Sequence, residues 1–158
     1  MKKVIFSMLI CIATTTNAQK ISYKVGIMTG IPVGISNTNV AVGSTFLEAT
    51  KTIPNKYLTN KFSLTLNSGY VRLRHNDNNI ISQVPVLIGA KYGINKEWYF
   101  GAAAGVTIPT NGENTSAKMG YSPYIGFQRD KISVDARYYV SGLKQPISTL
   151  ALVFSYKL

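Results

Sequence analysis

The stretch that decides the fold is residues 84–106, VPVLIGAKYGINKEWYFGAAAGV. Large apolar residues alternate with small or polar ones up to Tyr92 and again from Trp98, and the short polar segment at 93–96 separates the two runs. Successive side chains of a strand point to opposite faces, so this alternation indicates strands with one apolar face each. The stretch therefore predicts an antiparallel hairpin with a tight turn.

The same alternation recurs along the chain and predicts eight strands, at about 20–28, 43–52, 61–71, 81–92, 97–108, 118–128, 131–140 and 148–158. No stretch keeps the apolar spacing of a helix for more than one turn. The pattern at 43–52 is the weakest, because Phe46 falls on the same face as Glu48, and it predicts a possible bulge. Pro85 and Pro123 each remove a ladder hydrogen bond inside a strand, so a bulge or a frayed rim is expected at both.

The connections between these strands fall into two alternating sets. Residues 93–96 and 129–131 form tight turns and 53–60 a somewhat longer one, whereas 34–42, 73–79, 109–117 and 141–147 are longer and more polar. Short turns at one end, long loops at the other and an even strand number are typical of transmembrane barrels. The fold class is therefore predicted as all-β, an eight-stranded antiparallel up-and-down transmembrane β-barrel whose strands of roughly ten residues can cross a bilayer.

The two faces of the strands differ in chemistry. One carries Ile, Val, Leu and aromatic residues, as contact with lipid requires. The other is polar and holds five charges that would lie in the lumen: Lys24, Glu48, Lys91, Asp135 and Arg137. Eight strands leave a lumen that side chains can fill, and buried charges need partners, so these residues predict a plugged barrel. In the alternative, they only contact trapped water.

Aromatic residues on the apolar face predict girdles at the two membrane interfaces. The proposed girdle residues are Tyr23, Phe62, Tyr92, Trp98, Phe127 and Tyr156 near the short turns, and Tyr70, Tyr121 and Tyr138 near the loops.

The chain has 158 residues and a formal net charge of +11, with 46% apolar residues. This length suits one domain, and the apolar content excludes a disordered chain. Residues 1–18 predict a secretory signal peptide, because a basic start precedes an apolar core at 4–13 and a small residue, Ala18. Cleavage there would leave 19–158 as the barrel and remove the sole cysteine, Cys11. The predicted location is the cell outer membrane.

The hairpin at 84–106, the segment GYSPYIGF at 120–127 and the closing strand at 152–158 resemble the outer-membrane β-barrel domain family common in Bacteroidetes, a group of small porin-like and OmpA-like barrels. An Ala-Gln cleavage junction, here Ala18-Gln19, is typical of that group. The resemblance implies eight antiparallel strands in a Gram-negative outer membrane, inserted by the barrel-assembly machinery. Members often end on Phe, whereas this chain ends Tyr156-Lys157-Leu158, so Phe154 and Tyr156 are expected to take over that signal.

Catalytic chemistry is sparse. His75 is the sole histidine and has Asp77 nearby but no adjacent serine, so an ordinary loop histidine is expected and the protein is predicted not to be an enzyme. No converging His, Cys or carboxylate cluster predicts a metal, and no cofactor is expected. The cations are scattered, and only Arg72, Arg74 and His75 cluster, so no nucleic-acid partner is predicted.

A basic rim offers one binding hypothesis. Arg72, Arg74, Lys118 and Lys144 lie near the loop-side ends of strands, where lipopolysaccharide phosphates would lie. The guanidinium fork suits phosphate geometry. A generic solvated rim is the alternative.

These observations predict a small monomeric barrel in contact with outer-membrane lipids and lipopolysaccharide, whose surface loops mediate envelope or surface interactions. Three alternatives remain: a narrow pore, a lipid A-modifying barrel enzyme that would need His75, and a secreted lipocalin-like barrel that binds a ligand in an apolar interior.

Overall fold

The computed structural model describes residues 21–33, 42–53, 61–74, 80–111, 116–142 and 147–158. They form eight strands: β1 (Ile21–Val33), β2 (Val42–Thr52), β3 (Phe62–Arg74), β4 (Ile80–Gly93), β5 (Trp98–Pro109), β6 (Lys118–Arg129), β7 (Ile132–Ser141) and β8 (Ile147–Lys157). None of the described residues belongs to a helix that could cross a membrane. The predicted signal peptide at 1–18 lies outside the described residues.

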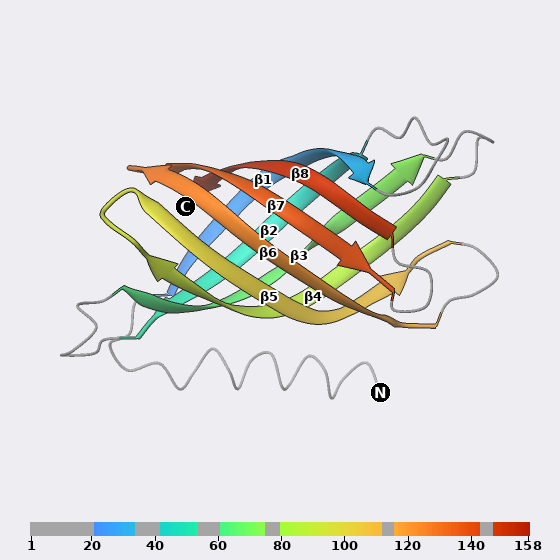
Figure 1. Ribbon diagram of the computed structural model, residues 1–158, viewed down its shortest axis with the longest axis horizontal. Helices are drawn as coiled ribbons and strands as arrows, with labels where there is room; N and C mark the ends of the chain where they lie inside the picture. Colours follow the sequence, from blue (N-terminus) through green and yellow to red (C-terminus); the bar gives the residue numbers. More distant parts are fainter. Residues whose placement is uncertain (1–20, 34–41, 54–60, 75–79, 112–115, 143–146) are drawn as a thin grey trace.

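The strands close into one barrel (Figure 1). Each strand pairs antiparallel with the next in sequence, and β8 pairs with β1, which confirms the predicted eight-stranded antiparallel fold. The β4–β5 and β6–β7 turns lie at one end, the short-turn end, together with the C-terminus. The opposite end, where β1 ends and β2 begins, is the loop end.

The register gives the barrel its tilt. Following the paired residues from strand to strand leads from Tyr23 on β1 round the barrel to Ser148 on β8. Ser148 pairs with Val33, which lies ten residues after Tyr23 on β1. A shear of ten residues on eight strands corresponds to a strand tilt of about 40°. From Tyr23 to Val33 the outward face of β1 therefore spans about 25 Å along the barrel axis, the height of an apolar transmembrane band.

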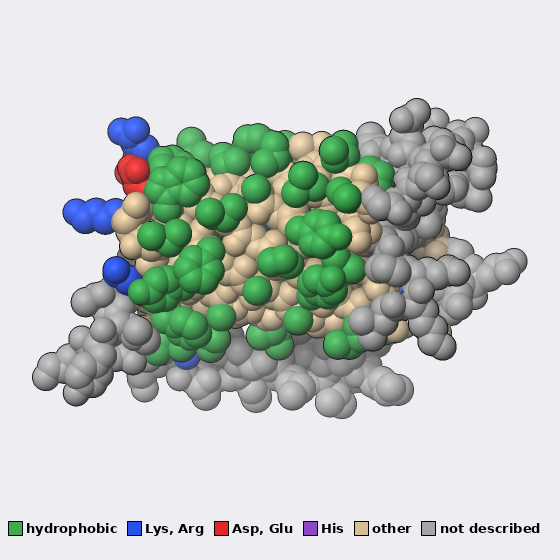
Figure 2. All heavy atoms as spheres, in the orientation of Figure 1, with side chains coloured by type: hydrophobic (Ala, Val, Ile, Leu, Met, Phe, Trp, Pro, Cys, Tyr) green, Lys and Arg blue, Asp and Glu red, His purple; other side chains and the backbone are tan. Residues whose placement is uncertain are grey.

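The outer wall is apolar and the interior is polar. Outward side chains include Ile27, Ile88 and Phe100, which are exposed at 64%, 69% and 50%. Figure 2 shows apolar side chains spread over the wall, while most charged side chains visible in this view gather at the short-turn end. A water-soluble fold would bury such residues, so the wall has the polarity expected of a surface in lipid.

Neither proline introduces a bulge, contrary to the sequence-based expectation. On either side of Pro85 the β3–β4 register is the same, and on either side of Pro123 the β6–β7 register is also unchanged. Both ladders simply skip the positions at the proline, because proline has no N–H to donate. Each proline still pairs on its other side, with Thr107 and Ala102 respectively.

Two further expectations are corrected. The pairing of β2 is continuous, so no bulge is present there, and Phe46 faces the lumen beside Glu48. Strand β1 continues five residues past the predicted end at Met28. Pro32 is accommodated because β1 pairs with β2 only as far as Gly30 and beyond that with β8 alone.

Local chemistry explains the tight turns. The Asn95 side-chain oxygen accepts hydrogen bonds from the backbone N–H of Glu97 at 2.8 Å and of Trp98 at 2.7 Å, which fixes the β4–β5 turn. The β6–β7 turn has two residues, and Asp130 adopts a φ of 54° there. Aspartate is one of the few non-glycine residues that tolerate this left-handed conformation.

Candidate functional site

The structure brings all five predicted lumen charges together inside the barrel. Lys24 extends from β1, Glu48 from β2, Lys91 from β4, and Asp135 and Arg137 from β7. All five residues are buried, with exposures between 2% and 9%. They come from strands that lie round the whole circumference, so their side chains converge on the barrel axis.

Glu48 is the centre of the network. One of its oxygens, Oε1, accepts a hydrogen bond from Lys91 Nζ at 2.9 Å and another from the Thr50 hydroxyl at 3.0 Å. The other oxygen, Oε2, lies 3.3 Å from Arg137 Nη2. A buried carboxylate is stable only when its oxygens are compensated in this way.

Arg137 joins the two acids. Its Nε and Nη2 donate to Asp135 Oδ2 at 3.2 and 2.8 Å, and its Nη1 donates to Asn67 Oδ1 at 3.4 Å. The Tyr99 hydroxyl donates to the other oxygen of Asp135. The guanidinium also lies against two rings, 4.1 Å from the centroid of Tyr124 and 4.5 Å from that of Phe46. Arginine suits this position because its flat cation can stack and donate several hydrogen bonds at once.

Two inward tyrosines depend on glycines on the neighbouring strand. Tyr99 pairs with Gly126 and Tyr124 pairs with Gly101 across β5 and β6. A Cβ at Gly126 would lie 2.5 Å from Tyr99 Cζ, and one at Gly101 would lie 2.5 Å from Tyr124 Cζ. Each ring therefore lies flat over a glycine of the opposite strand, and the two rings meet edge to face at 6.3 Å.

Lys24 is held differently from the other cations. Its Nζ donates to the Ser133 hydroxyl at 2.9 Å and lies 5.3 Å from the Tyr99 ring centroid. Within the described part of the chain, the ion pairs involve Glu48, Asp135, Lys91 and Arg137, and Lys24 is in none of them.

An apolar layer follows the charged layer toward the loop end. Met28, Phe46, Val71, Ala151 and Val153 form one buried cluster there, and Leu87, Ala103 and Tyr139 form another. Nearer the loops the described lumen residues are polar but neutral, with a hydrogen bond of 2.8 Å between the hydroxyls of Thr107 and Tyr139 and one of 3.3 Å from Ser141 to Gln83.

The residues of the basic rim are only partly described. Arg72 on β3 and Lys118 on β6 are exposed near the loop ends of their strands. Arg74 is described in its backbone alone, and Lys144 and His75 lie outside the described residues. The described residues contain no cluster of three or more potential metal ligands.

The aromatic residues lie on the outer wall, in two belts. Near the short-turn end, Trp98 contacts Phe127 with ring centroids 5.3 Å apart, and Tyr92 contacts Phe100 at 5.6 Å. Tyr23 and Tyr156 are exposed outward, and Phe62 pairs with Tyr92 in the same belt. Tyr70, Tyr121 and Tyr138 are exposed nearer the loops, although Met119 lies beyond Tyr121 on β6.

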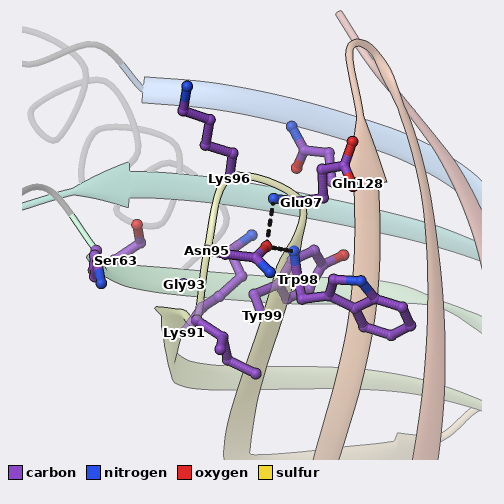
Figure 3. A pocket seen from close by; sticks show the side chains of 11 residues that line it. Ser63, Lys91, Gly93, Asn95, Lys96, Glu97, Trp98, Tyr99 and Gln128 are labelled. Carbon is purple, nitrogen blue, oxygen red and sulfur yellow. Dashed lines mark hydrogen bonds between the residues drawn. The ribbon is translucent and has the colours of Figure 1, made fainter.

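A cavity of about 540 Å³ opens at the short-turn end (Figure 3). Its floor includes Lys91, Tyr99 and Ser63, and its wall includes the β4–β5 turn with Lys96 and Glu97. Lys61 and Gln128 complete the polar part of the lining. This mouth was not identified from the sequence, because it is formed by residues of separate turns that only closure of the barrel brings together.

The apolar wall and ionic lumen define the class of fold as a small eight-stranded transmembrane β-barrel. No protein-family model matches the chain, and no curated protein matches it. Membership of the Bacteroidetes-type family therefore stays a prediction.

Among solved structures, the chain is similar to the Yersinia pestis outer membrane protein Ail in a phospholipid bilayer nanodisc, with 13% identity and a TM-score of 0.60 over 88% of this chain and 100% of that one. It is also similar to Ail in complex with the heparin analogue sucrose octasulfate, with 15% identity and a TM-score of 0.53 over 89% and 99%. A designed transmembrane β-barrel matches with 12% identity and a TM-score of 0.56 over 87% and 95%. Identities this low establish the fold alone.

Proposed function

We propose that the protein is a small, non-enzymatic integral outer-membrane barrel with a plugged lumen, whose loop end mediates interactions at the cell surface. One observation carries the proposal: four of the five buried charged side chains described form ion pairs inside the barrel, while large apolar side chains cover its outside. Lipid is the surroundings in which this distribution is stable.

The ion-pair network also supports the plug over the alternatives. A lipocalin-like barrel needs an apolar interior for its ligand, whereas this interior holds Glu48, Arg137 and their partners. A narrow pore needs an open path, whereas Arg137 stacks between Phe46 and Tyr124 in the middle of the lumen. A lipid A-modifying enzyme would depend on His75, which has no adjacent serine in the sequence.

Export and insertion follow from the same proposal. The signal peptide at 1–18 directs the chain out of the cytoplasm, and the barrel-assembly machinery inserts residues 19–158 as a monomer. Strand β8 presents Phe154 and Tyr156 outward, at 44% and 46% exposure, where an insertion signal on the closing strand has to be accessible.

Lipopolysaccharide is the proposed contact of the loop end. Arg72 and Lys118 are exposed there, and the likeness to an Ail structure holding a sulfated sugar adds support for an anionic glycan or lipid. Replacing Arg72, Arg74, Lys118 and Lys144 with Gln is expected to lower the lipopolysaccharide that copurifies with the barrel. A matched control replaces four cations of the short-turn end, Lys51, Lys96, Arg129 and Lys131, and is expected to leave it unchanged. Equal lipopolysaccharide content in both variants would contradict the proposal.

The barrel and its location are tested together by fractionation and heat-modifiability. The full-length gene is expressed, outer membranes are solubilised in detergent, and samples are run on a gel with and without boiling. We expect the protein in the outer-membrane fraction, with a band that shifts on boiling because the closed barrel resists detergent at low temperature. Recovery from the soluble periplasm without a shift would contradict the proposal and favour the ligand-binding soluble barrel.

A further inference from the structure

The buried charges of the lumen do not balance. Lys24, Lys91 and Arg137 carry three positive charges, and Glu48 and Asp135 carry two negative ones, so one positive charge is in excess. Of these three buried cations, Lys24 is the one outside the ion pairs of the described residues, and it relies on Ser133 and the face of Tyr99. A buried ammonium without a carboxylate is costly, and a nearby anion would offset that cost.

The excess charge lies next to the mouth at the short-turn end. Tyr99 is flanked by two ammonium groups, Lys24 Nζ at 5.3 Å and Lys91 Nζ at 4.9 Å from its ring centroid. Tyr99 and Lys91 also form part of the floor of the cavity of about 540 Å³. The cavity therefore gives an anion from solution access to the positively charged side of the network.

The wall of the cavity adds further positive charge. Lys61 and Lys96 line it, and neither belongs to an ion pair of the described residues. Glu97 is the one acid among the lining residues. Like charges that line a cleft with low-dielectric walls reinforce one another and raise the local concentration of the opposite ion.

We propose that this mouth is a binding site for an oxyanion of the phosphate class, attracted by Lys61 and Lys96 and received above Lys91. The lysine ammonium groups of the cavity and the Gln128 amide supply the hydrogen bonds that phosphate oxygens accept. The oxyanion is either free phosphate or the headgroup of an anionic lipid, and both share this chemistry. The site goes beyond the proposed surface role and can be tested in micelles, where its failure leaves the membrane location untouched.

Isothermal titration calorimetry provides the readout, because the ring of Trp98, the single tryptophan of the chain, packs against Phe127 on the outer wall and faces away from the cavity (Figure 3). The mature chain is refolded in dodecyl maltoside, which contains no phosphate, and inorganic phosphate is titrated at constant ionic strength while the heat of binding is measured. We expect a saturable change for the wild type. Lys61→Gln with Lys96→Gln should raise the Kd roughly tenfold or more, because two charge-assisted contacts are lost.

The matched control is Lys51→Gln with Lys131→Gln, which makes the same change in charge at the same end outside the cavity. We expect its Kd to stay within about threefold of wild type, the effect of net charge alone. A wild type without saturable binding, or equal losses in the two double variants, would overturn the proposal.

A second variant keeps the test decisive if the rim substitutions disturb the turns. Phosphate should raise the Tm of the wild type by mass action, because it binds the folded barrel. In Lys24→Met the lumen is neutral, so we expect the shift of Tm to shrink to less than half, while a gel-shift assay verifies the closed barrel. A full phosphate shift in Lys24→Met would show that the lumen charge does not contribute, and would contradict the proposal.

The source of the oxyanion is then distinguished by adding phosphatidylglycerol to the micelles. Competition with inorganic phosphate would identify the lipid headgroup as the ligand, and unchanged phosphate binding would identify the free anion. Either result supports the site.

Discussion

Glu48 on β2 and Arg137 on β7 meet inside the barrel at 3.3 Å, although 89 residues separate them in sequence. The carboxylate is shared, because Lys91 contacts its other oxygen at 2.9 Å. One acidic side chain therefore compensates two cations that extend from two other strands of the barrel wall.

Removal of this shared carboxylate should be costly. We expect Glu48→Gln to lower the free energy of unfolding by about 3–5 kcal/mol, because two buried cations lose their common partner. Denaturant unfolding of the refolded barrel in micelles measures it. The control is Glu97→Gln, the same chemical change at an exposed glutamate, which should alter stability by about 0.5 kcal/mol or less. Equal effects at the two positions would mean that the network does not stabilise the barrel.

The glycine under Tyr99 should be required. We expect Gly126→Ala to destabilise the barrel by about 1–3 kcal/mol, because the added methyl overlaps the Tyr99 ring and Asp135. Gly43→Ala is the matched control, since nothing lies within 4 Å of a Cβ there. The fraction of closed barrel on unboiled gels and the unfolding midpoint compare the two. A tolerated Gly126→Ala would show that Tyr99 can leave its place over β6.

A lysine on the wall should report depth in the membrane. Ile88 lies midway along β4 and is 69% exposed, whereas Ile132 begins β7 at the short-turn end with 63% exposure. In bilayers we expect Ile88→Lys to cost about 2–4 kcal/mol and Ile132→Lys about 0–1 kcal/mol. Reversible unfolding from lipid vesicles supplies both values. Two small and equal costs would indicate that the wall faces water.

The apolar layer should block ions. We expect no steady single-channel conductance from wild-type protein in planar bilayers, because Phe46, Leu87 and the stacked Arg137 fill the lumen, and the cavity beside them has only about 30 Å³. Phe46→Ala combined with Arg137→Ala removes the stacked pair, and a conductance should appear. Detergent-only bilayers control for leakage. Steady conductance by wild type would favour the narrow pore.

The barrel was predictable from the sequence because alternation is a strong local signal. Each run, such as Trp98 to Val106, assigns its own faces, whereas the ten-residue shear depends on the register of the pairing. The interior pairing was less accessible. Lys24 and Glu48 are direct cross-strand neighbours, which favours an ion pair between them, but Glu48 instead forms its ion pairs across the lumen with Lys91 and Arg137. A choice among partners across a lumen depends on side-chain reach, which periodicity does not encode.

The tyrosines of the network illustrate a signal that was present but incomplete. Tyr99 is followed by Gly101, and Tyr124 by Gly126, each two residues later on the inward face. Antiparallel pairing places each ring over the other strand's glycine, a complementarity visible only once the register is known. The prediction of bulges at the prolines was wrong for a related reason. Loss of one hydrogen-bond donor interrupts a ladder locally, whereas a bulge also requires an extra residue that the partner strand does not oppose.

The two proline gaps divide the closed wall. One interrupts β3–β4 and the other β6–β7, so strands β4, β5 and β6 form one panel and the remaining five strands form another, each with uninterrupted ladders. A cylinder of uniform pairing would resist opening equally on all sides. This one carries two seams, and under mechanical pulling or partial denaturation we expect amide exchange to begin along them, with the three-strand panel separating as a unit.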